Sequence, residues 1–333
     1  MDIRNRRALK QTAAQSLAGA PGQPKQAALA YAGISAALSL LTGAVNLLVS
    51  NRIAGTGGLA NMGLRSILST IQSILPLVQM LIVMGLGLGY QAAALKMSRR
   101  QESSPKTLLD GFYRFGPLFR MSLLQTVIYM AIAFVGMYVS IQIFIMTPLA
   151  SDLWEVLTPI LSSVTSLDSE IVLDEATLSA ASMAMWPVFP IFAVLFLAAA
   201  APIFYQYRMA NFCLLDASKP GAIAALRESR GMMRRNRFQL FKLDLSFWWF
   251  YLLELLVTVI CYGDMLLPLL GVTLPWSDTV SYFLFYTLSL ALQVGVYYLY
   301  LNRVNVTYAT AYEALRNPPQ QTNKVVLGNI FDM

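Results

Sequence analysis

Six long apolar runs constrain this chain more than any other feature of its sequence. They cover residues 27–50, 66–95, 121–146, 182–205, 245–270 and 280–302. About 20 consecutive apolar residues in an α-helix are enough to cross the hydrocarbon core of a bilayer. The sequence therefore predicts an all-α polytopic membrane protein with six transmembrane helices.

The composition agrees with this class of protein. The 333 residues are 57% hydrophobic and 12% charged, whereas a soluble domain carries about 25% charged residues. A chain so poor in charge cannot cover itself with a polar surface. We expect one membrane domain over residues 1–316, followed by a flexible cytoplasmic tail over 317–333.

The basic residues predict the orientation of the chain. Of the 24 lysines and arginines, only Arg52 and Arg65 fall in segments on one side of the predicted spans. All the others fall on the opposite side, and loops rich in Lys and Arg stay in the cytoplasm. The pattern predicts a multi-pass protein with both termini cytoplasmic.

Short amphipathic helices are expected at both faces of the membrane. The acidic segment between the third and fourth runs places apolar residues such as Leu153, Leu157 and Ile160 at helical spacing. Such a helix is typical of an interface, where it would form either a cap over the bundle or a lid over a substrate. On the cytoplasmic side, amphipathic helices are expected after the second and fourth spans.

The most basic segment follows the fourth run. Read as a helix that begins at Pro220, it places four arginines on one side: Arg227, Arg230, Arg234 and Arg237. Each arginine near an anionic membrane surface contributes about 1 kcal/mol. The interpretations are a topology signal that contacts anionic lipid headgroups, a surface for a cytosolic partner, or a nucleic-acid patch. The last is disfavoured because no recognition fold accompanies the charges.

Polar residues inside the apolar runs form a second candidate site. Glu254 lies roughly 15 Å into the fifth run at the helical rise, and an ionised group at that depth costs about 2.5–3.5 kcal/mol. The candidate polar path consists of Glu254, Thr258, Gln293 and Asn46. These side chains would either join helices by hydrogen bonds of about 0.6 kcal/mol each or line a path for a solute or lipid.

The sequence offers no catalytic residues, cofactor site or metal site. It contains no histidine, which removes the most common general base and metal ligand. The glycine-rich stretch at 85–89 ends an apolar run and does not connect a strand to a helix. We therefore interpret it as helix packing and not as a nucleotide loop.

The segment after the fourth run also carries a resemblance to a known family. The residues concerned are Ser229, Arg230, Met232, Met233, Arg237, Leu240, Phe241, Leu243, Leu245, Ser246, Phe247 and Trp249. Together with "RRALKQTAAQSLAG" near the N-terminus and "YATAYEAL" after the last run, they resemble the bacterial membrane proteins grouped as domain of unknown function 975. Arg235 and Asn236 depart from that pattern. The resemblance implies the plasma membrane of a bacterium and implies no activity.

The leading hypothesis is an integral plasma membrane protein that is not an enzyme. It would organise the membrane or a partner complex through the basic cytoplasmic helix. The expected partners are the lipid bilayer, anionic lipid headgroups and other membrane proteins, with no nucleic acid. The alternative is a transporter or channel for a small solute or lipid that uses Glu254.

Overall fold

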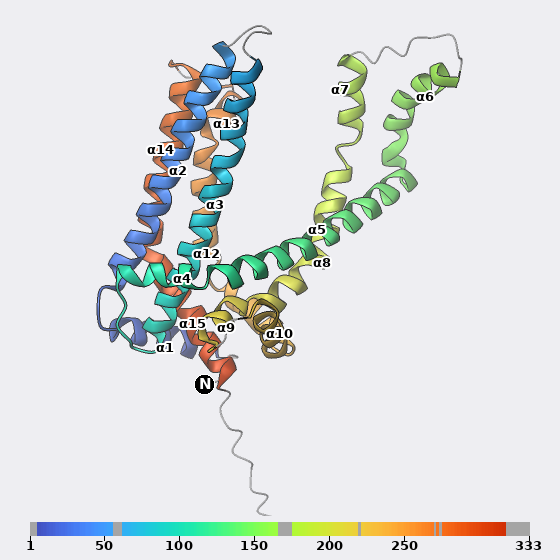
Figure 1. Ribbon diagram of the computed structural model, residues 1–333. Helices are drawn as coiled ribbons and strands as arrows, with labels where there is room; N and C mark the ends of the chain where they lie inside the picture. The colour runs from blue at the N-terminus through green and yellow to red at the C-terminus, as the bar shows by residue number, and fades with distance from the viewer. Residues whose placement is uncertain are drawn as a thin grey trace, which may run out of the picture. The chain divides into compact units, whose positions relative to one another are not determined.

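The computed structural model describes residues 5–55, 62–165, 175–218, 221–269, 271–272 and 275–317 (Figure 1). Within these ranges every regular element is a helix, and the only β-type pairing is an isolated bridge between Gly22 and Ser103. The predicted all-α fold class is therefore confirmed for the described residues. The predicted tail lies outside them from residue 318 onward.

Five helices are long and apolar enough to cross a membrane: Pro24–Ile53, Gly63–Ser98, Phe115–Met146, Val188–Asp216 and Thr279–Arg316. They coincide with the first, second, third, fourth and sixth predicted spans. A sixth is reached only if α11 (Arg237–Leu245) and α12 (Trp248–Cys261), which are bent by 61° at the short break between them, form one broken span. The described part of the chain thus contains five or six candidate membrane helices, and the exact six-span topology stays a prediction.

The fifth predicted span is not one continuous helix. The described residues of 245–270 contain α12, a turn at Tyr262 and then α13 (Gly263–Leu269). Gly263 packs so closely against α14 (Asp278–Val296) that an added Cβ would lie 2.7 Å from the Phe285 ring. The tight approach of α13 to α14 therefore requires a glycine directly after the turn.

The described chain forms two compact units. Unit 1 contains the residues up to Leu118 and those from Met209 onward, and unit 2 contains Phe119–Arg208. The remaining elements of unit 1 are α1 (Arg6–Ala18), α2 (Pro24–Gly55), α3 (Met62–Ser98), η2 (Pro105–Leu109), α4 (Asp110–Tyr113), α9 (Ala210–Asp216), α10 (Ala222–Met233), η4 (Tyr297–Leu301) and α15 (Asn302–Arg316). The single domain predicted over 1–316 stays a prediction.

Long helices of unit 1 form a bundle of α2, α3, α12 and α14 (Figure 1). Polar side chains join three of them, since Gln79 donates a hydrogen bond to the Ser39 hydroxyl over 2.8 Å and Tyr286 donates to the Ser39 carbonyl over 2.9 Å. Gln72 also donates to the Ser50 hydroxyl over 3.1 Å. At these positions the polar stripes of the sequence serve helix packing.

Short helices gather at one end of this bundle, which we call the base: α1, η2, α4, α9, α10, α11 and α15 (Figure 1). Close glycine contacts bring η2 and α4 against α3. A Cβ added to Gly89 would lie 1.9 Å from the Leu108 carbonyl oxygen, and one added to Gly111 would lie 2.1 Å from the Gly85 carbonyl oxygen. The glycine-rich stretch is thus a packing surface, as interpreted from the sequence.

Unit 2 contains α5 (Phe115–Met146), η3 (Pro148–Ala150), α6 (Ser151–Thr165), α7 (Glu175–Ala184) and α8 (Val188–Tyr207). Its core consists of Phe144, Ala150 and Val188, with Leu153 of α6 packed against it. A helix therefore occupies part of the acidic segment, and its amphipathic character and place at an interface stay predictions. Its side chains from residue 159 onward lie outside the described residues.

The contact at Gly89 gives a test of the base. We expect Gly89→Ala to lower the free energy of unfolding by roughly 1–3 kcal/mol, because overpacking forces the helices apart. The readout is the unfolding temperature of the purified protein in neutral detergent. Gly33→Ala is the matched control, since no atom lies within 4 Å of its added Cβ. Equal unfolding temperatures in the two variants would contradict the packing role.

Candidate functional site

Glu254 lies on α12 among aromatic and polar side chains of the bundle. Gln293 of α14 lies next to its carboxyl group, and Tyr31 and Tyr297 are close enough to interact with its charge. The Glu254 Oε1 atom is buried and has no hydrogen-bond partner among the described residues. Gln293 Nε2 donates to the Tyr297 hydroxyl over 3.3 Å. The carboxyl group therefore has an unused acceptor in a polar cluster.

The cluster around Glu254 continues into the base. Tyr31 stacks on Tyr297 with 6.2 Å between ring centroids and on Tyr90 with 5.1 Å. Tyr90 donates to Asn302 Oδ1 over 2.6 Å, and Asn302 Nδ2 donates to the Pro24 carbonyl over 2.9 Å. A row of polar and aromatic groups thus leads from Glu254 to the first residue of α2.

Glu254 is nearer to the base than its place in the predicted span suggests. Because α12 begins at Trp248, Glu254 lies only roughly 9 Å along the helix from its start. On α2, Asn46 lies roughly 22 Å beyond Tyr31, the residue of that helix beside Glu254. Asn46 also has a buried Oδ1 without a partner among the described residues. The structure therefore separates Asn46 from the cluster.

Thr258 and Gln293 have different positions relative to Glu254. Thr258 is exposed, and its hydroxyl donates to the Glu254 backbone carbonyl over 2.9 Å. The Thr258 hydroxyl therefore forms its hydrogen bond within α12 and none with a described side chain of the cluster. Gln293 is the one predicted path residue that lies next to the Glu254 carboxyl group.

The predicted arginine helix is divided in two. α10 ends at Met233, residues 234–236 form a turn, and α11 begins at Arg237. Asn236 Nδ2 donates to the Met232 carbonyl over 2.9 Å and so covers the end of α10. The predicted start at Pro220 lies outside the described residues.

The division changes which arginines share a surface. Arg227, Arg230 and Arg234 are exposed, whereas Arg237 is half-buried. The opposite side of α10 is buried, with Leu226 at 9% and Met233 at 0% exposure. Three of the four predicted arginines therefore face solvent or lipid.

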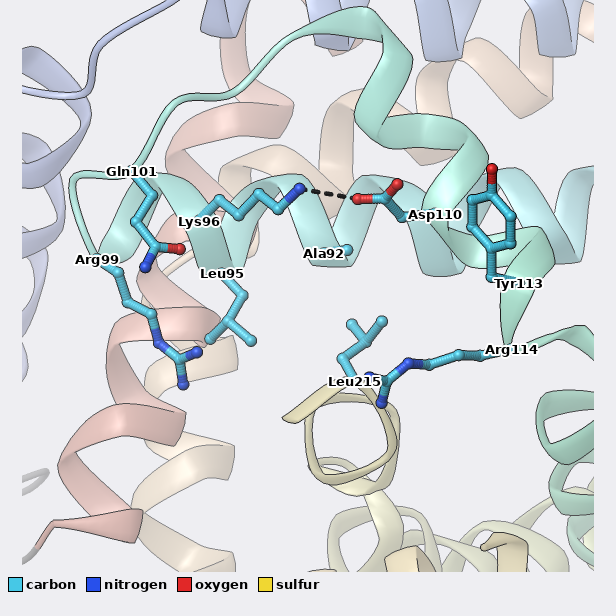
Figure 2. Close-up of a pocket in the computed structure, with 9 residues that line it drawn as sticks. All are labelled: Ala92, Leu95, Lys96, Arg99, Gln101, Asp110, Tyr113, Arg114 and Leu215. Carbon is cyan, nitrogen blue, oxygen red and sulfur yellow. Dashed lines mark hydrogen bonds and ion pairs between the residues drawn. The ribbon is translucent and has the colours of Figure 1, made fainter. Parts of the chain in front are cut away.

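A pocket of ≈ 310 Å³ lies at the base, where α3, α4 and α9 meet. Figure 2 shows Lys96 and Asp110 along one side and the guanidinium groups of Arg99 and Arg114 on the other. Lys96 Nζ and Asp110 Oδ2 form an ion pair of 2.8 Å. The sequence analysis missed this pocket, because it used these cations only to predict orientation.

Asp216 and Glu313 hold the outer side of the pocket together. Arg99 contacts Asp216 over 3.0 Å and Glu313 over 2.5 Å, from positions 117 and 214 residues away. Arg316 pairs with Asp216, which also accepts a hydrogen bond from Tyr312 over 3.1 Å. No sequence pattern could indicate partners so far apart along the chain.

Metal binding has no support in the described part of the chain. No group of three or more Cys, Asp or Glu side chains is placed there to hold an ion. The two cysteines, Cys213 and Cys261, are both free.

The comparison with protein families covers almost the whole chain. A model of proteins of unknown function, DUF975, matches residues 1–317. The chain belongs to the DUF975 family. The searches of curated proteins and of solved structures found no match.

Several of the residues that carry the DUF975 resemblance are packing residues. Ser229, Leu240, Leu243 and Phe247 are all less than 5% exposed. Trp249 packs its ring at 4.7 Å from Tyr300. These residues therefore fix α10, α11 and α12 to the rest of unit 1, while Arg230 remains exposed and Arg237 is half-buried.

The DUF975 termini pack on one another in the same unit. α1 contacts α15, and Lys10 Nζ donates to the Ser246 carbonyl over 2.9 Å. The Lys10 ammonium also lies 3.9 Å from the centre of the Phe247 ring. Burial, with a smaller effect of the Arg6 charge, lowers the pKa of Lys10. The first helix thus covers the junction of α11 and α12.

The Asp216 contacts give a test of the base. We expect Asp216→Asn to lower the free energy of unfolding by about 1–3 kcal/mol, since two arginines lose a partly buried partner. Denaturation of the protein in neutral detergent measures the change. Asp110→Asn is the control: its ion pair with Lys96 is 40% exposed on both sides, so the loss should stay below about 1 kcal/mol. If Asp110→Asn lost more unfolding free energy than Asp216→Asn, the structural role assigned to Asp216 would be wrong.

Proposed function

We propose that this DUF975 protein is a bacterial plasma membrane protein, not an enzyme, that binds the anionic inner surface of the bilayer through α10 and α11. The proposal rests on the exposed arginines of α10 and on the apolar side chains that follow them. In this arrangement the protein organises lipids or neighbouring membrane proteins at the cytoplasmic face.

Apolar exposure on α11 is the observation that carries the proposal. Phe238, Phe241 and Leu245 recur at helical spacing on α11 and are all more than 40% exposed, as is Trp248 at the start of α12. The other side of α11 is buried through Leu240 and Leu243. A short helix with exposed aromatic side chains directly after a basic helix is typical of an element that lies in the membrane interface.

The distribution of charge supports the proposed orientation. Arg52 lies in the last turn of α2 and Arg65 in the first turn of α3, so both lie at the end of the bundle opposite the base. Most other lysines and arginines of unit 1 lie in the base helices or beside them. Under the positive-inside rule, the base and both termini lie in the cytoplasm.

An environment-sensitive fluorophore on α11 tests the proposal. The label is attached at Phe238→Cys in a Cys261→Ser background, because Cys213 is only 1% exposed and resists labelling. In lipid nanodiscs containing phosphatidylglycerol, we expect blue-shifted emission from an apolar interface. Replacement of Arg227 and Arg230 by Gln should weaken this shift.

The matched control replaces Arg52 and Arg65 by Gln, which removes the same charge at the other end of the bundle. We expect this variant to keep the blue shift. Emission typical of water in every lipid mixture, or equal loss in both double variants, would reject α10 and α11 as the membrane-surface element.

Transport of a small solute is the second candidate function. Two observations favour it: the buried Glu254 Oε1, which has no hydrogen-bond partner in the described part of the chain, and the π-helix of η4, which begins four residues after Gln293. Single π-helical turns occur frequently at functional sites, and carboxyl groups inside membranes are typical of proton relays.

Proton flux tests this candidate. Proteoliposomes with a trapped pH-sensitive dye should dissipate an imposed pH gradient faster than protein-free liposomes. We expect Glu254→Gln to reduce the rate to that of protein-free liposomes, and exposed Glu228→Gln to leave it unchanged. A wild-type rate no faster than that of empty liposomes would eliminate proton movement through Glu254.

A further inference from the structure

The pocket at the base combines positive charge with unused hydrogen-bond donors. Arg99 directs Nε and Nη2 to Glu313 and Asp216, and its Nη1 has no partner among the described residues. Arg114 uses Nη1 for the carbonyls of Leu214 and Ala217. Its Nε and Nη2 have no described partner. The protein's own contacts therefore fix both guanidinium groups and leave donors for another acceptor.

Lys96 adds a third cation that is only partly neutralised. Its ammonium group has three donors, and one of them contacts Asp110 over 2.8 Å. The other charged groups that line the pocket are Arg99 and Arg114, so cations outnumber the single carboxylate there. Arg99 also pairs with Asp216 and Glu313, which do not line the pocket, and Asp216 pairs with Arg316. With these groups included, four cations stand against three carboxylates, so the cluster keeps a net positive charge.

The remaining wall of the pocket is partly apolar, because Gln101 and Tyr113 line it together with three aliphatic residues. Ala92 and Leu95 come from α3 and Leu215 from α9. The volume of ≈ 310 Å³ is at the lower end of the roughly 300–1,000 Å³ of small-molecule sites. A phosphate group with a short apolar or glycerol extension fits this combination of size, charge and lining.

We infer that this pocket binds a phosphate group, either free or as part of a lipid headgroup, through Lys96, Arg99 and Arg114. Arginine provides planar donors that suit phosphate oxygens, and lysine provides a mobile point charge. The site goes beyond the proposed membrane-surface function, because it uses none of the arginines of α10.

Asp110 sets the direction of the test. Its carboxylate repels an incoming anion and occupies Lys96, so Asp110→Asn should tighten binding several-fold. Lys96→Gln removes a cation and should weaken binding roughly tenfold, or about 1.4 kcal/mol. A purely structural ion pair predicts no such opposite effects, since loss of either partner would only disturb the fold.

The measurement is isothermal titration calorimetry of the full-length protein in neutral detergent. The probes are inorganic phosphate, dioctanoyl phosphatidic acid and, as a zwitterionic comparison, dioctanoyl phosphatidylcholine. Lys106→Gln is the matched control, because Lys106 is an exposed cation of the adjacent η2 helix outside the pocket. We expect its affinities to equal those of the wild type.

The outcomes separate the two sources of phosphate. Binding of both phosphate and phosphatidic acid supports the site with the phosphate group as a sufficient ligand. Binding of phosphatidic acid alone supports it with a lipid as the source. If neither binds, if Asp110→Asn weakens binding, or if Lys96→Gln equals Lys106→Gln, the inference is overturned.

Two further safeguards keep this result independent. If Lys96→Gln does not fold, the predicted gain in affinity of Asp110→Asn decides alone. The fluorophore at Phe238→Cys reports on α11 and not on the pocket. Failure here with a retained blue shift would therefore leave the proposed membrane-surface function intact, and the converse result would leave the phosphate site intact.

Discussion

A buried hydrogen-bond chain joins the bundle of unit 1 to its base. Tyr90, 3% exposed, donates to Asn302, 5% exposed, and Asn302 donates to the carbonyl of Pro24. Buried polar groups are costly unless they are hydrogen-bonded. These three residues therefore fix the positions of α2, α3 and α15 along one another. The chain fixes the start of α2 against the last turns of α3 and the start of α15. Tyr31 stacks on Tyr90, and this contact extends the packed region from the hydrogen-bond chain toward Glu254.

Once α3 and α15 are fixed, the short helices of the base have few alternatives. Because Gly89 has no side chain, the backbone of η2 packs directly against α3. α4 therefore begins beside Lys96, and Arg114 lies near the carboxyl end of α9. α9 then presents Asp216 to Arg99. The pocket is the space left between elements that glycine contacts and ion pairs hold in place. Protein contacts therefore hold the guanidinium groups of Arg99 and Arg114 in place before any ligand arrives, which lowers the entropy that binding has to overcome.

Much of the helical architecture follows from the sequence because length and hydropathy are local properties. The apolar runs and the packing glycines can both be predicted in this way. The break after Cys261 cannot, because it depends on Gly263 meeting Phe285 of another helix. The spacing of the arginines predicts one continuous helix, but the turn at 234–236 interrupts it. Arg237 therefore does not share the exposed side with the other three arginines. The pocket depends on pairs between distant segments, which no local pattern contains.

Positive charge in this chain has two physical roles that a count of lysines and arginines merges. Arg99, Arg114 and Arg316 have protein partners and hold helices together. By contrast, no ion pair within the described residues involves Arg227 or Arg230, and both are exposed. An exposed arginine without a protein partner keeps its full attraction for an anionic surface, whereas the protein contacts of Arg99 and Arg114 fix their guanidinium groups and leave only the remaining donors for an anion. The orientation of the chain depends on all the basic residues together. The role of each arginine depends on whether it contacts protein groups or remains exposed, and only the three-dimensional structure shows which.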